Sequence, residues 1–217
     1  YGVSIAGKSH NPRDGSYRTG EELINDSLPA SALGQLLKDS LGKALKFCVP
    51  GAPWYVMAPP GPTFLVFGSV LNELGCWRQT LVWCKHHYVL GRSDYYYRHE
   101  PIFYGWVPGG AHHFGAHKSQ TSVLEYNKPA RSDEHPTMKP IGLVQQCIEN
   151  SSMAGWLVGD PFAGSGTTLL AADAVQRVAR LIELDPRYCD VIRRRWTALA
   201  CAEGQDPGPG ALEPLES

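Results

Sequence analysis

The sequence lacks an excess of charge of either sign, and it lacks any long hydrophobic run. It has 20 lysines and arginines against 21 aspartates and glutamates, which gives a formal net charge of −1. No global basic field therefore attracts a polyanion, and any contact with nucleic acid has to come from local basic patches. No apolar run approaches the ~18 residues of a membrane span, so we expect a cytoplasmic protein without membrane contact.

Cysteine is present, but without the spacing of a metal site or a disulfide framework. The six cysteines share no Cys-x-x-Cys pattern: Cys48, Cys76, Cys84, Cys147, Cys189 and Cys201. The histidines of residues 106–132 also lack carboxylates or cysteines at the spacing that metal ligands require. We therefore expect reduced, mostly buried thiols and no bound metal.

The most informative stretch is residues 160–168, Asp-Pro-Phe-Ala-Gly-Ser-Gly-Thr-Thr. An apolar run of strand length, 155–159, comes before it, and a segment of helical composition, 168–175, comes after it. A strand, a glycine turn and a helix together present backbone N–H groups and a helix N-terminus to a ligand. Gly164 and Gly166 allow the backbone to approach that ligand without a Cβ in between.

Two acidic residues at predicted strand ends indicate what the ligand contains. A second strand is expected at 178–182, and it ends on Glu183. An acidic residue at this place after the glycines typically accepts hydrogen bonds from ribose hydroxyls. Asp160 ends the preceding strand in the same way. The pair predicts a site for an adenosine-containing ligand.

Other phosphate-binding patterns are disfavoured because their defining residues are missing. A P-loop has Gly-Lys-Ser/Thr, whereas Gly166 is followed by Thr167. A dinucleotide fingerprint has a third small residue where Leu169 stands, which disfavours a pyrophosphate ligand and a nucleotide-binding oxidoreductase. A tight turn that binds nothing is the third alternative, and the acidic pair Asp160 and Glu183 argues against it.

Hydrophobic periodicity predicts a chain in which helices and strands alternate. Helices are expected at 31–47, 62–74, 141–150 and over a last segment that includes 188–199. Further strands are expected at 54–58, 78–84 and 101–105. The alternation predicts a doubly wound, mostly parallel α/β sheet, and the short distance between the last two strands favours an antiparallel hairpin at its edge. The Pro-, Gly- and Glu-rich residues 204–217 indicate a disordered tail.

Three motifs together resemble the β class of amino-group DNA methyltransferases. They are the stretch 160–168, His135-Pro-Thr-Met-Lys-Pro140 and Ile182-Glu-Leu-Asp-Pro-Arg-Tyr188. The opening Tyr1-Gly-Val also resembles the end of that family's catalytic motif, Asp-Pro-Pro-Tyr-Gly-Val. In this class the catalytic motif precedes the cofactor motif. The resemblance therefore implies a permuted methyltransferase domain over 1–203, with the catalytic half first and the cofactor half last.

The resemblance also implies an activity and a set of site residues. Such enzymes move a methyl group from S-adenosylmethionine to the exocyclic amino group of a flipped base, here adenine N6 rather than cytosine N4, in bacterial or phage restriction–modification. Tyr1 would stack on that base as the catalytic residue. The expected cofactor-binding residues are Lys139, Asp160, Phe162, Gly164, Gly166, Thr167 and Glu183. The expected DNA-binding residues are Lys8, Arg13, Arg18, Arg98, His113 and Lys118, and 106–132 would be a short target-recognition segment.

Several alternatives stay open at this point. The Asp (or Ser) and the prolyl carbonyl of the catalytic motif would precede Tyr1, so a catalytically inactive remnant that binds S-adenosylmethionine or DNA is the main alternative to an enzyme. The family places the strand that ends in this motif centrally in the sheet. We therefore expect residues 1–217 alone neither to methylate DNA nor to melt cooperatively. The tyrosines 95–97 are typical either of a partly buried sheet end or of a wall for a flipped base.

Overall fold

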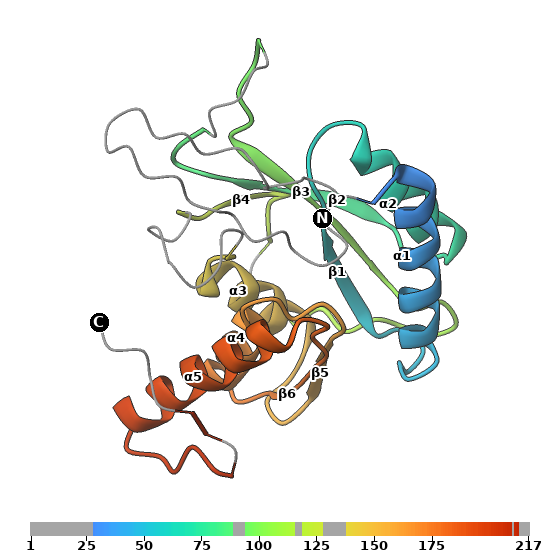
Figure 1. The fold of residues 1–217 in the computed structure, drawn as a ribbon. Helices are drawn as coiled ribbons and strands as arrows, with labels where there is room; N and C mark the ends of the chain where they lie inside the picture. The colour runs from blue at the N-terminus through green and yellow to red at the C-terminus, as the bar shows by residue number, and fades with distance from the viewer. Residues whose placement is uncertain (1–27, 89–93, 116–118, 128–137, 210, 213–217) are drawn as a thin grey trace.

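The computed structural model describes residues 28–88, 94–115, 119–127, 138–209 and 211–212 (Figure 1). The helices are α1 (Ala30–Leu45), α2 (Thr63–Glu73), α3 (Ile141–Ser151), α4 (Thr167–Ala174) and α5 (Pro186–Ala202). The strands are β1 (Pro53–Met57), β2 (Gln79–Cys84), β3 (His99–Trp106), β4 (Val123–Glu125), β5 (Leu157–Asp160) and β6 (Val178–Leu181). None of the helices in these ranges is long and apolar enough to cross a membrane.

The strands form a four-stranded sheet in the order β1-β3-β2-β4 and a two-stranded sheet of β5 and β6. β3 runs antiparallel to both β1 and β2, whereas the β2–β4 and β5–β6 pairs are parallel. The α/β class and the antiparallel hairpin are confirmed. The hairpin's position at an edge is wrong within the described residues, because β3 pairs on both sides and β1 and β4 form the edges.

Side chains alternate along the strands between two layers of helices. Trp54 and Val56 of β1 pack with Phe103 of β3 in the cluster that includes buried residues of α1 and α2. The neighbouring positions Tyr55 and Ile102 face the other way, into the cluster that includes residues of α3. Helices therefore cover both faces of this sheet, as the doubly wound class predicts (Figure 1).

Helix α3 connects the two sheets. Leu143 and Cys147 pack with the four-stranded sheet in the second cluster. Val144 and Ile148, on a neighbouring face of the helix, pack with Val158 of β5 and with alanines of α4. A helix that is apolar on two adjacent faces is typical of one that is buried between layers.

Two segments differ from the sequence-based expectations. No strand was expected within residues 106–132, yet they contain β4, which pairs with β2 through Val82 and Val123. Its three residues are too few to show a period-2 pattern. In the expected tail, the carbonyl of Pro207 accepts a hydrogen bond from Trp196 Nε1 of α5. The domain boundary at residue 203 stays a prediction.

Candidate functional site

The glycine turn joins β5 to α4 in a conformation that requires glycine. Gly164 has φ 53° and Gly166 has φ 77°, both in the left-handed region that residues with a Cβ avoid. A Cβ on Gly166 would also lie 2.8 Å from Cγ1 of Ile192 in α5. The loop therefore passes close to α5, and the first turn of α4 follows it directly.

Asp160 holds the two ends of this loop together. Its Oδ1 accepts the backbone N–H of Phe162 at 2.9 Å, and its Oδ2 accepts the hydroxyl of Thr168 at 2.6 Å. Thr168 was not among the predicted site residues. The predicted Thr167 is only 6% exposed, so its hydroxyl lies largely inside the protein. The prediction that Thr167 binds the cofactor stays a prediction.

Glu183, which follows β6, lies directly against the glycine turn, as its position in the sequence predicted. Its Oε2 accepts the backbone N–H of Gly164 at 2.7 Å, and its Oε1 accepts that of Asp185 at 2.9 Å. Each carboxylate oxygen has two lone pairs, so each keeps an acceptor position for a further donor. The acidic strand end and the glycines therefore form one site.

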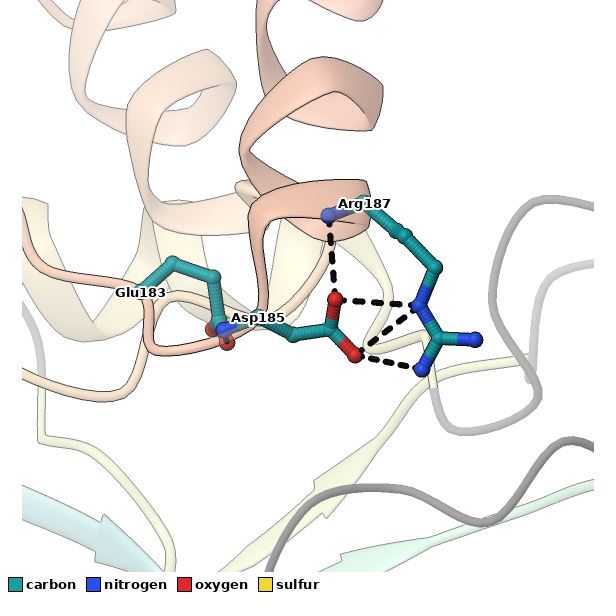
Figure 2. Close-up of polar contacts among 3 residues, drawn as sticks. All are labelled: Glu183, Asp185 and Arg187. Atoms are coloured by element: carbon teal, nitrogen blue, oxygen red, sulfur yellow. Dashed lines mark hydrogen bonds and ion pairs between the residues drawn. The ribbon is translucent and has the colours of Figure 1, made fainter.

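Asp185 caps the N-terminus of helix α5, next to Glu183 (Figure 2). Its Oδ1 accepts the backbone N–H of Arg187 at 3.0 Å, and its Oδ2 forms an ion pair with the Arg187 guanidinium at 2.6 Å. The hydrogen bonds from Arg187 hold the pKa of Asp185 below its usual range despite burial. An aspartate followed by proline is a typical helix start, so the sequence carried a signal for this cap.

Helix α5 also contacts the glycine turn through a side chain well beyond its N-terminus, Arg195. Nη1 of Arg195 donates a hydrogen bond to the backbone carbonyl of Ser165, whose residue is buried. Phe162 is partly buried and packs against the cluster of α1, α2 and the four-stranded sheet. The loop of residues 160–168 is therefore held by α5 and by the cluster that includes α1, α2 and the four-stranded sheet. No local sequence pattern indicated the role of Arg195, because it lies 30 residues from its partner.

Lys139, at the start of α3, belongs to a cluster of two lysines and one glutamate. Glu100 accepts from Lys85 Nζ through Oε1 at 2.6 Å and from Lys139 Nζ through Oε2 at 2.7 Å. Both ammonium groups also lie over the ring of Trp83, at 5.0 and 5.7 Å from its centroid. Burial would raise the pKa of Glu100, but the two ammonium groups outweigh it and hold the pKa below its ordinary value.

Lys139 and the glycine turn lie at the same end of the molecule. Arg177, just after α4, donates to the carbonyl of Ser152, just after α3, so these two helices end side by side. The same helices pack along their length through Ile148 and Ala171. Their starts, with Lys139 before one and the glycine turn before the other, therefore lie together at the opposite end. Of the predicted cofactor residues, Asp160, Gly164 and Glu183 lie within or against the loop, and Lys139 lies at the same end of the molecule.

Arg98 lies beside a basic hollow at the end of the β2–β3 hairpin. The hollow has a volume of about 250 Å³ and is lined by Cys84, Lys85, His86, Arg98 and Glu125. Tyr95, Tyr96 and Tyr97 precede Arg98 and are 45–89% exposed. The ring of Tyr96 stacks on that of Tyr88 at 5.4 Å. Tyr96 and Tyr97 are thus more than half covered, and the wall for a flipped base stays a prediction.

His113 lies at the other end of the sheets. It follows the end of β3 and contacts the ring of Trp156, just before β5, at 5.2 Å between centroids. Arg98 directly precedes β3 and Trp106 ends it, so the eight-residue strand separates the two. Gly115 also donates to the carbonyl of Asn150 near the end of α3, so this segment lies at the opposite end of α3 from Lys139. The expected recognition segment is thus divided between the two ends.

Some predicted residues lie outside the described ranges: Tyr1, Lys8, Arg13, Arg18 and Lys118. All six cysteines are described and are free thiols, with Cys76 and Cys147 buried and Cys201 exposed. Within the described ranges no group of three or more His, Cys, Asp or Glu side chains is arranged to hold a metal ion.

The fold agrees with solved structures of α/β methyltransferases. M1.HpyAVI in complex with SAM superposes with a TM-score of 0.63 at 21% identity, covering 73% of this chain and 82% of that one. TTHA0409 of Thermus thermophilus, complexed with S-adenosyl-L-methionine, superposes with a TM-score of 0.61 at 24% identity. The match covers 86% of this chain and 83% of that one. The cytosine-N4-specific PvuII DNA methyltransferase superposes with a TM-score of 0.61 at 16% identity. The match covers 82% of this chain and 74% of that one. At these identities the similarity shows the fold alone.

The family follows from sequence. The model of the DNA methylase family, which covers the N6 and N4 amino-methyltransferases, matches residues 54–194. The chain belongs to this family.

Individual relatives match over shorter stretches. The type II methyltransferase M2.MboI of Moraxella bovis is 38% identical over 63 residues, which are 29% of this chain and 23% of that protein. M.XycI of Xanthomonas campestris pv. cyanopsidis is 34% identical over 93 residues, which are 41% and 30%. The matched stretches thus span less than a third of the relatives' own lengths.

Proposed function

We propose that this chain binds S-adenosylmethionine and belongs to an enzyme that methylates the exocyclic amino group of a DNA base. The hydrogen bond between Gly164 and Glu183 is the observation that carries this proposal. It joins the loop before a helix N-terminus, which presents backbone N–H groups to a ligand, to a carboxylate that can accept hydrogen bonds from ribose hydroxyls. The relatives named as type II methyltransferases support the same activity.

The residues at this end fit the two ends of the cofactor. Glu183 keeps acceptor positions for the ribose hydroxyls after it accepts the N–H groups of Gly164 and Asp185. Lys139 has three N–H donors and gives one to Glu100, so it keeps donors for the carboxylate of the methionyl part. When bound, the cofactor supplies the electrophilic methyl group, and the chain's residues place it beside the target nitrogen.

The tyrosines and cations of the β2–β3 hairpin form the DNA side of the proposal. An extruded base stacks on aromatic rings, and its phosphates pair with cations such as Arg98. Adenine N6 is the proposed target, on the resemblance of Tyr1-Gly-Val and Gly7-Lys8 to adenine members of the family. Stacking by Tyr1 remains part of the proposal.

The cofactor site is tested by calorimetry with S-adenosylmethionine. In a version extended upstream of Tyr1, Glu183→Ala should weaken binding by at least ~1.5 kcal/mol, because a charge-assisted hydrogen bond is lost. The control is Glu203→Ala, since Glu203 is exposed just after α5. Equal affinity of Glu183→Ala and the parent would remove Glu183 from the site.

The activity is tested with duplex DNA and labelled cofactor, followed by analysis of the nucleosides. A version extended upstream of Tyr1 is expected to give products methylated at adenine N6, and methylation at cytosine N4 would correct the target base. Cofactor binding without any methylated product would favour the catalytically inactive remnant.

A further inference from the structure

The family resemblance did not indicate the ion-pair cluster of Lys85, Glu100 and Lys139. Its three charges come from three places in the chain: the residue after β2, the second residue of β3 and the segment before α3. Lys85 is only 7% exposed, and an ammonium group is rarely buried to this extent unless it is paired. The cluster is therefore a built feature of the interior rather than a surface ion pair.

Glu100 is shared completely between the two lysines. One carboxylate oxygen accepts from Lys85 and the other from Lys139. This arrangement fixes the direction in which Lys139 presents its remaining N–H groups. It also leaves one positive charge in excess, because two ammonium groups face a single carboxylate.

We propose that Glu100 is a positioning residue for the cofactor's carboxylate, acting through Lys139. The inference rests on the proposed cofactor site, which places the methionyl end at the start of α3. Lys139 contacts the ligand, Glu100 sets its orientation, and Lys85 on the far side of Glu100 holds that carboxylate in place. Trp83, under both ammonium groups, limits the positions that they can take.

Charge alone predicts the opposite effect of removing Glu100. Without its negative charge the site carries more positive charge, and by Coulomb attraction alone it should bind a carboxylate more tightly. If Glu100 acts by position, its loss frees Lys139 and weakens binding. The direction of the change therefore distinguishes positioning from net charge.

The experiment compares two probes by calorimetry: S-adenosylhomocysteine, which has the amino-acid end, and 5′-methylthioadenosine, which lacks it. Glu100→Gln should weaken S-adenosylhomocysteine binding about tenfold, as for one charge-assisted hydrogen bond, and change 5′-methylthioadenosine binding less than about twofold. Glu100→Asp keeps the charge but is too short to reach both lysines, so it should give an intermediate loss. It also serves as the test variant if the glutamine variant does not fold.

The matched control is Glu73→Gln, which breaks the exposed Lys38–Glu73 ion pair between α1 and α2 and should change neither affinity. Unchanged or tighter binding of S-adenosylhomocysteine by both Glu100 variants would overturn the inference. Equal weakening of both probes would also overturn it, because it would show a purely structural role. If the parent binds neither probe, the proposed function itself is wrong, and the inference fails with it.

Discussion

Two part-buried carboxylates at the same end of the molecule, Glu183 and Glu100, are held in different ways. Glu183 accepts backbone N–H groups from Gly164 and Asp185, within one strand–loop–helix–strand unit. Glu100, in β3 of the other sheet, accepts the ammonium groups of two lysines, one after β2 and one before α3. The first arrangement depends on backbone conformation and the second on side-chain charge. We therefore expect the first to fail through local strain and the second through loss of charge.

The largest effect should come from Gly166→Ala. The left-handed conformation costs a residue with a Cβ roughly 1–2 kcal/mol, and the clash with Ile192 adds roughly 1–3 kcal/mol. The free energy of unfolding should therefore fall by about 2–5 kcal/mol. It is measured, here and for the variants below, by denaturant titration of a version extended upstream of Tyr1.

Gly155→Ala is the control for this variant. Gly155 has φ 78°, but nothing lies within 4 Å of an added Cβ, so this variant should show only the conformational cost. Equal losses for the two alanine variants would mean that the close approach to α5 contributes nothing.

A smaller effect is expected when the loop's polar clamp is removed. Asp160→Ala takes away the acceptors of Phe162 N–H and Thr168 Oγ1–H, so unfolding free energy should fall by roughly 2–3 kcal/mol. Thr168→Val removes one of these bonds and should cost about 1 kcal/mol. Because both changes break the same bond, the double variant should lose less than the sum of the two single losses. Strict additivity would show that the Asp160–Thr168 bond is not formed in solution.

The smallest expected effect is a pH dependence of the stability that Glu100 contributes. Its pKa is lowered from an ordinary value of 4.5 by the two lysines. A lowered pKa means that the charged cluster contributes stability above about pH 4.5, and that this contribution is lost as the pH falls through the lower folded-state pKa. The stability difference between the parent and Glu100→Gln should therefore be constant near neutral pH and shrink in acid. A difference that grows as the pH falls would contradict this assignment.

The elements of the fold were largely predictable because each carries its own local pattern. The glycine turn, for example, was identified from Gly164 and Gly166, and both adopt positive φ. β4 escaped prediction, since three residues with Leu124 buried and its neighbours exposed carry too little periodicity. The place of β3 between β1 and β2 was also missed. Proximity in sequence indicates that two strands pair, but it does not say what lies on the other side of each.

The parts of the candidate site that lie close together in the sequence were predictable, and contacts between distant residues were not. Asp160 and Glu183 stand at strand ends next to the glycines, so parallel pairing of β5 and β6 brings them together. The hydrogen bond from Thr168 to Asp160 was not predicted, because the sequence does not show which side chain of the first helical turn reaches back to the strand end. Arg195 and Glu100 carried no signal, since each acts on a residue 30 or more positions away.

The sequence by itself determined the strand–glycine–helix unit and the acidic residue that closes it. These features depend on backbone conformations and hydrogen bonds over short distances along the chain. Only the tertiary structure decided that Lys139 is paired through Glu100 with Lys85, and that His113 lies at the opposite end from Arg98. Those relations depend on the order and direction of β1 to β4 and on the packing of α3 between two sheets, which residues far apart in sequence establish together.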